Sequence, residues 1–366
     1  MARMALIVGI NSYQNLKQLH GCVNDAESVY ALLSKNDDAE KPEYGSKNFE
    51  CKLITKEDRF VQSEVVHNEK KNLAIFNKTI LRDEIKDLFE TEGLELALFY
   101  FSGHGLIDSD GGYICPPETK TADDCIPLNK IVEWASKSPA TNKVIIIDSC
   151  HSGAIGENQD NKTSTLGKNM TLLASSTATQ YSSEENDQGL FTGLMLLGLE
   201  GAAANIIGDV TPASIYSHID QSLGRWYKQR PIFKSNVSAF VVLRKAKPPI
   251  ALKDLKEIVQ LFPSQTNELP DGSTEVKATY KHFLNETYEP EDSERHKRFK
   301  DAREPDKENC RKFAILQKYN RVYLVVPKGG DEPHMWHAAM QKDRHGYCEL
   351  TLLGEHYRGL VEKGLI

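Results

Sequence analysis

The chain of 366 residues has no long hydrophobic run. No apolar stretch reaches the roughly 18 residues that a membrane-spanning helix needs, because the longest candidate, residues 190–199, is interrupted by a threonine and two glycines. The amino-terminal apolar stretch is too short for a signal peptide, and no small-residue cleavage site follows it. We therefore expect a protein with no membrane partner.

Cysteines are few, and negative charge exceeds positive charge. The seven cysteines are an odd number, widely scattered, and form neither a disulfide framework nor paired Cys-x-x-Cys metal motifs. A reducing cytoplasm is the expected location. Residues 1–244 carry a net charge of −8 and residues 245–366 a net charge of +1. The acidic first part favours a basic peptide ligand over nucleic acid, and the neutral second part lacks a broad basic surface for it.

Strand-like and helix-like segments alternate through the first 244 residues. This alternation predicts an α/β fold, with a mostly parallel sheet and helices on both faces. The expected strands are residues 4–10, 49–54, 94–101, 144–148, 170–175 and 237–243. The expected helices are residues 25–35, 78–91, 128–136, 189–204 and 212–227, with Asn24 as the N-cap of the first.

The alternation stops at Lys245-Ala246-Lys247-Pro248-Pro249, where a double proline in a basic setting indicates a domain boundary. We predict a first domain over residues 1–244, a linker over 245–252 and a smaller, mainly helical domain over 253–366. Helices are expected at 252–262, 274–288 and 352–365, and a strand at 347–351. The end of this domain is weakly similar to some winged-helix domains.

Two short segments place reactive side chains at the ends of expected strands. They are Phe101-Ser102-Gly103-His104-Gly105 and Asp148-Ser149-Cys150-His151-Ser152-Gly153, and each follows an apolar run typical of a buried parallel strand. Ligands bind beyond the carboxyl ends of the strands in open α/β sheets. If the two strands are neighbours, a histidine and a cysteine meet at one edge of the sheet, which is the arrangement of a cysteine nucleophile and its base.

Glycines surround both reactive residues. His104 lies between two glycines, which lets a substrate approach the backbone, and the amides of Gly105 and Cys150 could stabilise a developing oxyanion. The alternative is that Cys150 is a buried structural thiol and His104 an ordinary loop histidine. The paired strand-end placement favours the catalytic interpretation.

The two segments closely resemble the caspase-like cysteine peptidases, particularly their prokaryotic and metacaspase branch. Further stretches are similar to this family's first strand, its loop into the first helix and the region after a late strand: Ile7-Val8-Gly9-Ile10-Asn11-Ser12-Tyr13, Leu19-His20-Gly21-Cys22-Val23-Asn24-Asp25-Ala26 and Gln188-Gly189-Leu190-Phe191-Thr192. The resemblance covers residues 3–244. The animal-caspase signature Gln-Ala-Cys-x-Gly is absent, which argues against specificity for aspartate.

The resemblance implies a cysteine endopeptidase that needs no cofactor for its chemistry and cleaves a polypeptide after arginine or lysine. Family positions for the basic side chain map onto Asp25 and Asp148. Two converging carboxylates favour a cation, and a guanidinium can bind them bidentately. Alternatively, Asp25 interacts with the dipole of its helix, and Asp148 holds the turn of the nucleophile.

The family also implies a loop that is cut during activation and, in some members, a calcium site. Lys162 and Lys168 are the candidate self-cleavage positions in the loop 154–169, and an uncut flexible loop is the equal alternative. The candidate calcium ligands are Asp110, Asp123, Asp124 and Glu157. Carboxylates suit calcium, but adjacent aspartates in a surface loop are often only a solvated turn.

Bacterial caspase-like peptidases are commonly fused to sensor or adaptor modules, often in phage defence. By this analogy, the C-terminal domain would bind an activating ligand, such as a nucleotide second messenger, or a partner protein, and would gate the peptidase. Two alternatives remain from the sequence. One is a catalytically silent caspase-fold adaptor that binds partners through this domain, and the other is a regulator that binds nucleic acid, which the neutral charge disfavours.

Overall fold

The computed structural model describes residues 2–37, 45–55, 76–109, 111–149, 166–175, 184–185, 188–225, 227, 230–268, 274–278, 281–283, 304–328, 335 and 347–366. The chain divides into two compact units, Met1–Lys247 and Pro248–Ile366, and this division falls within the predicted linker. Each unit is described by itself. Within these described ranges, no helix has the length and apolar character to cross a bilayer.

The first unit is built on a six-stranded sheet with the order β12-β8-β7-β3-β1-β2. Its strands are β1 (Ala2–Gly9), β2 (Glu50–Thr55), β3 (Leu94–Ser102), β7 (Asn142–Asp148), β8 (Met170–Ala174) and β12 (Ile232–Asn236). All neighbouring pairs are parallel except β12 with β8, which are antiparallel. The predicted mostly parallel sheet is confirmed.

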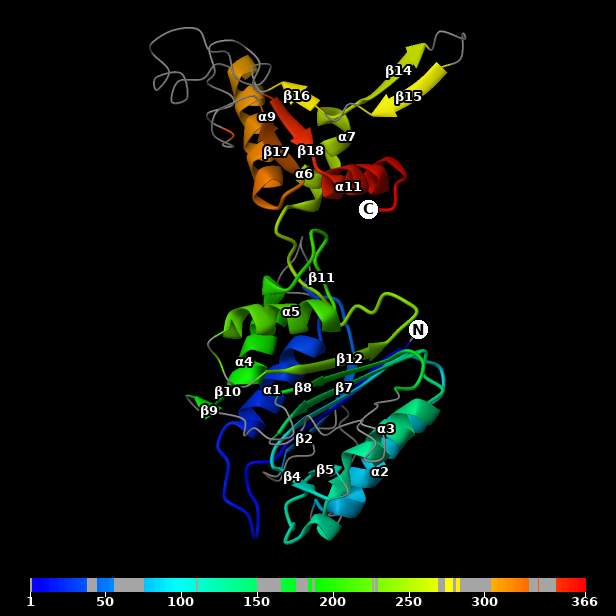
Figure 1. Ribbon diagram of the computed structural model, residues 1–366, viewed down its shortest axis with the longest axis vertical. Helices are drawn as coiled ribbons and strands as arrows, with labels where there is room; N and C mark the ends of the chain where they lie inside the picture. Colours follow the sequence, from blue (N-terminus) through cyan, green and yellow to red (C-terminus); the bar gives the residue numbers. More distant parts are fainter. Residues whose placement is uncertain are drawn as a thin grey trace, which may run out of the picture. The chain divides into compact units, whose positions relative to one another are not determined.

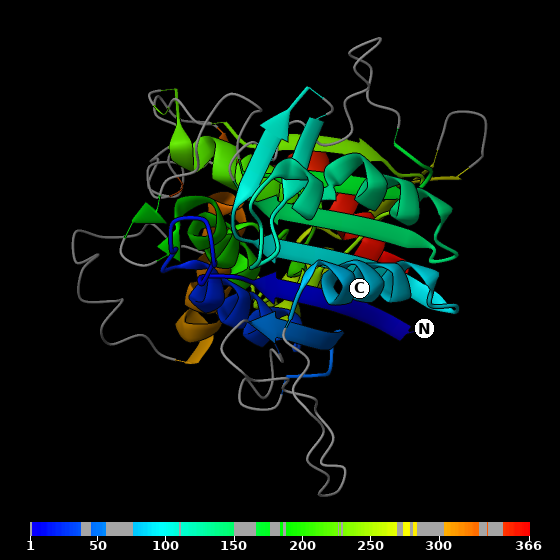
Figure 2. The same cartoon turned by 90° about the horizontal axis from the view of Figure 1, so that it is seen from below.

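Helices cover both faces of this sheet (Figure 1). One face packs against α1 (Cys22–Leu33), α4 (Leu190–Leu197) and α5 (Pro212–Leu223). The other packs against α2 (Lys78–Glu90) and α3 (Leu128–Lys137), the cyan and teal helices that lie in front of the strands in Figure 2. Because both faces are buried, the central strands are apolar at nearly every position.

Successive residues of β3 and β7 point to opposite faces. Phe99 and Phe101 belong to the core beneath α2 and α3, whereas Leu98 and Tyr100 belong to the core beneath α1, α4 and α5. This alternation directs the last residue of each strand, Ser102 and Asp148, toward the face that α1 and α4 cover. The alternation of side chains along β3 and β7 therefore decides which helices lie next to Ser102 and Asp148.

Shorter elements complete the first unit. A three-stranded antiparallel sheet follows β3 directly and consists of β4 (Gly105–Asp108), β5 (Gly111–Ile114) and β6 (Ile126–Pro127). The helical turn η2 (Ala122–Asp124) precedes β6. The remaining elements are β9 (Glu184–Glu185), β10 (Gln188–Gly189), η4 (Gly198–Ala202), β11 (Asp209–Val210) and β13 (Arg244–Lys245).

Two local predictions for this unit are wrong. The strand expected at 237–243 is a loop, because Val237 and Phe240 are exposed there while Val241 and Leu243 insert into the core singly. The N-cap of α1 is Gly21 instead of Asn24. The distant side chain of Asn11 accepts the Val23 N–H at 3.2 Å and so replaces a local cap.

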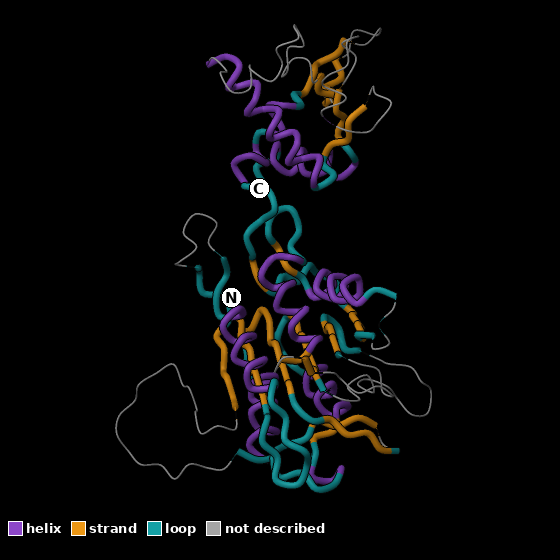
Figure 3. Tube along the Cα trace, turned by 90° about the vertical axis from the view of Figure 1, so that its left-hand side faces the viewer, coloured by secondary structure: helices purple, strands orange, loops and turns teal. Residues whose placement is uncertain are grey.

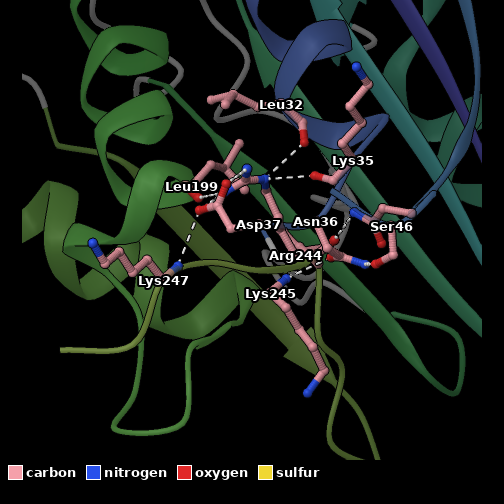
Figure 4. Close-up of polar contacts among 11 residues, drawn as sticks. Leu32, Lys35, Asn36, Asp37, Ser46, Leu199, Arg244, Lys245 and Lys247 are labelled. Carbon is pink, nitrogen blue, oxygen red and sulfur yellow. Dashed lines mark hydrogen bonds and ion pairs between the residues drawn. The ribbon is translucent and has the colours of Figure 1, made fainter. Parts of the chain in front are cut away.

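Arg244, just before the boundary between the units, is the centre of a buried polar cluster that we call the arginine cluster (Figure 4). Its side chain is 5% exposed and pairs with both carboxylate oxygens of Asp37, at 2.7 and 3.2 Å. It also donates to the backbone carbonyls of Leu32, Lys35 and Leu199. Asp37 accepts in addition the N–H of Lys247, so the cluster fixes the end of the first unit to α1 and to the turn after α4.

The second unit combines helices with small antiparallel sheets (Figure 3). Its helices are α6 (Leu252–Lys256), α7 (Ile258–Leu261), α9 (Glu304–Arg321) and α11 (Leu352–Glu362). Its strands are β14 (Ser264–Glu268) with β15 (Thr274–Ala278), and β16 (Lys281–Phe283), β18 (Tyr347–Leu350) and β17 (Val325–Lys328).

Two predicted elements of the second unit are confirmed and one is wrong. The strand at 347–351 and the helix at 352–365 are confirmed within a few residues. The helix expected at 274–288 is wrong, because its described part forms β15 and β16. Thr274, Glu275 and Val276 alternate as a strand does, and the partner β14 supplies the hydrogen bonds that decide the structure.

Candidate active site

The two strands that carry the predicted reactive residues are neighbours in the sheet. Ser102 at the end of β3 lies opposite Asp148 at the end of β7, and the N–H of Gly103 donates to the carbonyl of Asp148 at 3.2 Å. The segments that follow β3 and β7 therefore leave the sheet at the same edge, as predicted from the sequence. Cys150 and residues 151–165 lie outside the described residues, and Ser149 is the last described residue before them.

His104 follows β3 and is half-buried in a defined setting. Its N–H donates to the hydroxyl oxygen of Tyr13 at 2.8 Å, and the two rings meet edge to face with centroids 4.7 Å apart. The ring Nε2 lies 2.7 Å from the carbonyl oxygen of Lys17. A carbonyl can only accept, so Nε2 carries a proton, and Nδ1 is the nitrogen whose lone pair can accept one from another group.

The turn that presents the Lys17 carbonyl is fixed by its own hydrogen bonds. The side chain of Gln18 accepts from the N–H of Tyr13 at 3.0 Å and donates to the carbonyl of the same residue at 2.6 Å. Burial raises the pKa of Tyr13 well above its usual value, so its hydroxyl stays protonated. Sequence reasoning missed this support because the group that contacts His104 is a backbone oxygen.

Gly103 and Gly105 frame His104 for different reasons. A Cβ on Gly103 would lie 2.6 Å from the Tyr13 hydroxyl and 2.8 Å from the Phe101 ring, so only glycine fits between them. Gly105 is buried and begins β4, where it pairs with Ile114. The role of its amide in stabilising an oxyanion stays a prediction.

The two predicted specificity residues, Asp25 on α1 and Asp148 on β7, lie side by side, and we call them the acidic pair. They are 1% and 6% exposed. A Cβ on Gly189 would lie 2.7 Å from Oδ2 of Asp148 and 3.0 Å from Oδ2 of Asp25. Both carboxylates therefore border the same small space beside Gly189, although 123 positions separate them in the sequence.

Neutral donors hold the acidic pair. The hydroxyl of Ser102 and the N–H of Gly189 each donate to Asp25 at 3.3 Å. The hydroxyl of Thr192 donates to Asp148 at 2.7 Å. Ser102, Gly189 and Thr192 are site residues to which sequence reasoning assigned no individual role, although the stretches 101–105 and 188–192 that contain them resemble family motifs.

Tyr100 extends this network into the core. Its hydroxyl lies 2.7 Å from that of Thr192, and because Thr192 gives its proton to Asp148, Tyr100 must donate to Thr192. Burial, followed by the negative charges of Asp25 and Asp148, raises the pKa of Tyr100 well above its usual value. The tyrosine thus remains a donor across the accessible pH range.

The other predicted positions are only partly described. Among the candidate calcium ligands, Asp110 and Glu157 lie outside the described residues, and Asp123 is exposed in η2. Asp124 closes a capping box by accepting the N–H groups of Lys120 and Thr121, which lower its pKa. In the described part of the chain, no three or more histidine, cysteine or acidic side chains are grouped as metal ligands.

The structure describes one of the two candidate self-cleavage positions. Lys162 lies outside the described residues, whereas Lys168 is described and exposed just before β8. The backbone carbonyl of Lys168 accepts a hydrogen bond from the side chain of Lys143 at 2.8 Å.

The fold agrees with the family comparison. The model of the caspase domain family matches residues 2–241, which is more than half of the chain. The chain therefore belongs to the caspase domain family of cysteine peptidases. The family assignment covers the whole central sheet and both helical layers.

Individual relatives match a smaller part. Metacaspase-1A of Neurospora crassa is 30% identical over 164 residues, covering 42% of this chain and 32% of the relative. Metacaspase-1A of Aspergillus terreus is 28% identical over 163 residues, covering 42% and 36%. The chain thus spans about a third of the length of these curated relatives.

Two solved structures are also similar. Caspase-1 from Spodoptera frugiperda aligns with a TM-score of 0.47 and 14% identity, over 67% of this chain and 91% of that chain. Protein GSU0716 from Geobacter sulfurreducens aligns with a TM-score of 0.46 and 16% identity, over 68% and 98%.

Proposed function

We propose that this protein is a cysteine endopeptidase that cleaves polypeptides after arginine or lysine, with Cys150 as nucleophile and His104 as general base. The observation that carries the proposal is the setting of His104, whose Nε2 donates to the Lys17 carbonyl at the edge of the sheet where β7 leads to Cys150. Membership of the caspase domain family supports the same chemistry.

The proposed reaction proceeds through an acyl-enzyme. Nδ1 of His104 takes the proton of the Cys150 thiol, and the thiolate attacks the carbonyl carbon of the peptide bond. The amides of Gly105 and Cys150 stabilise the oxyanion. His104 then gives its proton to the leaving amine as the C–N bond breaks, and finally deprotonates the water that hydrolyses the thioester.

The acidic pair supports a basic residue before the cut. Two buried carboxylates on one space attract a cation, and a guanidinium can donate to both oxygens of a carboxylate. The donors from Ser102, Gly189 and Thr192 hold the carboxylates in place before substrate binds. Such pre-organisation limits the entropy lost on binding.

The test compares the protein with its Cys150→Ala variant on peptides that present Arg, Lys, Asp or Leu before the cleavable bond. We expect turnover of the Arg and Lys peptides only, and none by the variant. A matched control is Cys51→Ala, because Cys51 lies near the opposite end of the strands, beside Ala5. Equal cleavage of the Asp peptide would contradict the specificity, and no turnover under any condition would favour the silent adaptor.

We propose further that the second unit gates this activity in bacterial antiviral defence by binding a nucleotide second messenger or a partner protein. Its separation as a compact unit directly after the peptidase supports a distinct role. Running the same peptide panel on the full chain with and without cyclic nucleotides tests the idea, and calcium is added as a separate arm. A rate unchanged by every nucleotide would remove nucleotide gating.

A further inference from the structure

Two cysteines beside the candidate active site face each other across a small sheet. The sulfur atoms of Cys115 and Cys125 are 3.5 Å apart, and the residues are 0% and 1% exposed. In the pairing of β5 with β6, Tyr113 lies opposite Pro127 and Ile114 opposite Ile126. Continued by one residue, this register places Cys115 directly opposite Cys125.

This placement suits a disulfide bond. Directly opposed residues of an antiparallel pair have Cβ atoms roughly 4.5–5.5 Å apart, and a disulfide needs about 3.5–4.5 Å. A small movement of the two segments is therefore enough. The Cys125 thiol is also activated, because its hydrogen bond with Cys115 lowers its pKa and the thiolate is the reactive form of cysteine.

A small oxidant has a short route to Cys125. The turn immediately before it exposes Lys120, Thr121 and Asp123. The sulfur of Cys125 contacts the Thr119 hydroxyl and the Thr121 carbonyl, both at 3.6 Å, so it lies directly beneath this turn. Opening of one short turn is enough to admit a peroxide.

The two cysteines contact the support of His104 by two routes. The N–H of Cys115 donates to the carbonyl of His104 at 3.0 Å. The segment between the cysteines also holds the turn that carries the Lys17 carbonyl. Its residue Pro117 accepts the N–H of Gln14 at 2.8 Å, and the carbonyl of Glu118 accepts from the side chain of Asn15 at 3.1 Å.

We propose that Cys115 and Cys125 form a reversible disulfide that changes the placement of His104 and so makes the site sensitive to peroxide. The Cys125 thiolate attacks one oxygen of hydrogen peroxide, the O–O bond breaks, and the departing hydroxide takes a proton to become water. The Cys115 thiolate then attacks the sulfenic sulfur, and the S–O bond breaks with release of a second water. One peroxide is reduced and two thiols are oxidised.

Oxidation is expected to lower activity, and this effect alone rests on the proposed peptidase function. Contraction of the sulfur separation to about 2.05 Å draws Cys125 away from Thr119 and Thr121 and moves the segment that supports the Lys17 turn. Small displacements of a catalytic group cost large factors in rate, so we expect kcat/KM to fall by about tenfold.

The first experiment detects the bond without using activity. The Cys150→Ala chain is treated with hydrogen peroxide, alkylated and digested, and its peptides are weighed before and after reduction by dithiothreitol. We expect a linked Cys115–Cys125 peptide that dithiothreitol separates, and none from the matched Cys150→Ala, Cys125→Ser chain. Full alkylation of both thiols after oxidation would overturn the proposal.

The second experiment tests the coupling to His104. Wild-type protein is compared with Cys125→Ser and Cys115→Ser after the same oxidation, because any oxidation of Cys150 affects all three equally. Only the wild type should show the additional, dithiothreitol-reversible loss. A linked peptide without this difference would refute control of His104.

A spectroscopic readout separates this proposal from the proposed function. In the Cys150→Ala chain, the imidazole nitrogen resonances of His104 should shift on oxidation and return on reduction, and should not shift when Cys125 is serine. If the reduced wild type cleaves no peptide, the peptidase proposal fails, whereas the linked peptide and the His104 resonances still decide this one. Unchanged resonances in a linked protein would refute the coupling.

Discussion

Two acidic regions of the first unit are held by different chemistry. In the arginine cluster, Asp37 meets the guanidinium of Arg244, which the chain itself supplies. In the acidic pair, Asp25 and Asp148 meet hydroxyl and amide donors from Ser102, Gly189 and Thr192. In the first arrangement an arginine pairs with a carboxylate, whereas the second brings two carboxylates together at the edge of the sheet.

The difference shows how the same interaction can stabilise a structure or bind a ligand. Arg244 demonstrates the geometry that this chain uses for a guanidinium, with both oxygens of one carboxylate and several backbone carbonyls around it. We propose that a substrate arginine makes a similar contact with the acidic pair. Loss of Asp37 or Arg244 should then affect folding, and loss of Asp25 or Asp148 should affect cleavage.

The largest effect is expected for Asp148→Asn. Removing one member of a buried charge contact costs roughly 2–5 kcal/mol, so kcat/KM for an arginine peptide should fall by about 30- to 5,000-fold. The midpoint of thermal unfolding should change little, because the side-chain oxygen of asparagine can still accept the hydrogen bond from Thr192. Peptide cleavage kinetics and calorimetry measure the two quantities.

A citrulline peptide is the control, because citrulline has the shape of arginine without its charge. The variant should lose far less activity on citrulline than on arginine. An equal loss on both peptides would mean that Asp148 holds the turn of the nucleophile and does not bind the substrate.

The next effect concerns stability. Arg244→Met should lower the free energy of unfolding by about 3 kcal/mol, because Asp37 loses the guanidinium and the backbone carbonyls of Leu32, Lys35 and Leu199 lose their donor. Urea unfolding measures this loss. Lys137→Met on α3 is the control, since Lys137 and its ion-pair partner Glu133 are 73% and 41% exposed and solvent screens such a pair. Equal losses for both variants would deny the cluster its structural role.

A smaller effect is expected for Gly189→Ala. The added methyl group would meet Oδ2 of both members of the acidic pair, so it should raise KM for the arginine peptide by about tenfold and cost roughly 1–3 kcal/mol of stability. The control is Gly359→Ala on α11, where the methyl group enters open space and should be neutral or slightly stabilising. An unchanged KM would show that the space beside Gly189 is not used by the substrate.

The smallest effect belongs to an exposed charge group on α3. Lys130 and Lys137 lower the pKa of Glu133 to about 2. Because this pKa is depressed in the folded state, the contribution of Glu133 to folding stability is fully present above the unfolded pKa near 4.5 and is lost as the pH falls toward 2. Glu133→Gln should change the unfolding midpoint by less than about 1 °C at pH 7, since solvent screens these charges. A larger change by calorimetry would contradict the contrast between exposed and buried charge.

The central sheet could be predicted from the sequence because its strands have a distinctive apolar pattern. The runs that form β3 and β7 are apolar on both faces, which only a doubly covered sheet requires, and polar residues end each run abruptly. The same reasoning misplaced a strand at 237–243, where apolar residues enter the core one at a time from a loop. Burial can be predicted from the sequence where a whole segment is buried, but not where single residues of a loop enter the core.

The candidate site was predicted in part. His104, Asp25 and Asp148 were singled out, and the structure brings the two aspartates together beside Gly189. Thr192 was not assigned a role, because its contact with Asp148 spans 44 positions and depends on where α4 begins. Nor could the sequence identify the Lys17 carbonyl, since every residue has a backbone oxygen and none is distinguished by type.

The sequence by itself determined the apolar strands, the polar segments that end them and a linker over residues 245–252, because each depends on neighbouring residues and their periodicity. Only the tertiary structure decided which groups meet: the Lys17 carbonyl with His104, Thr192 with Asp148, and Cys115 with Cys125. These contacts depend on strand order, register and the direction of each side chain, and those are set by packing of the whole unit.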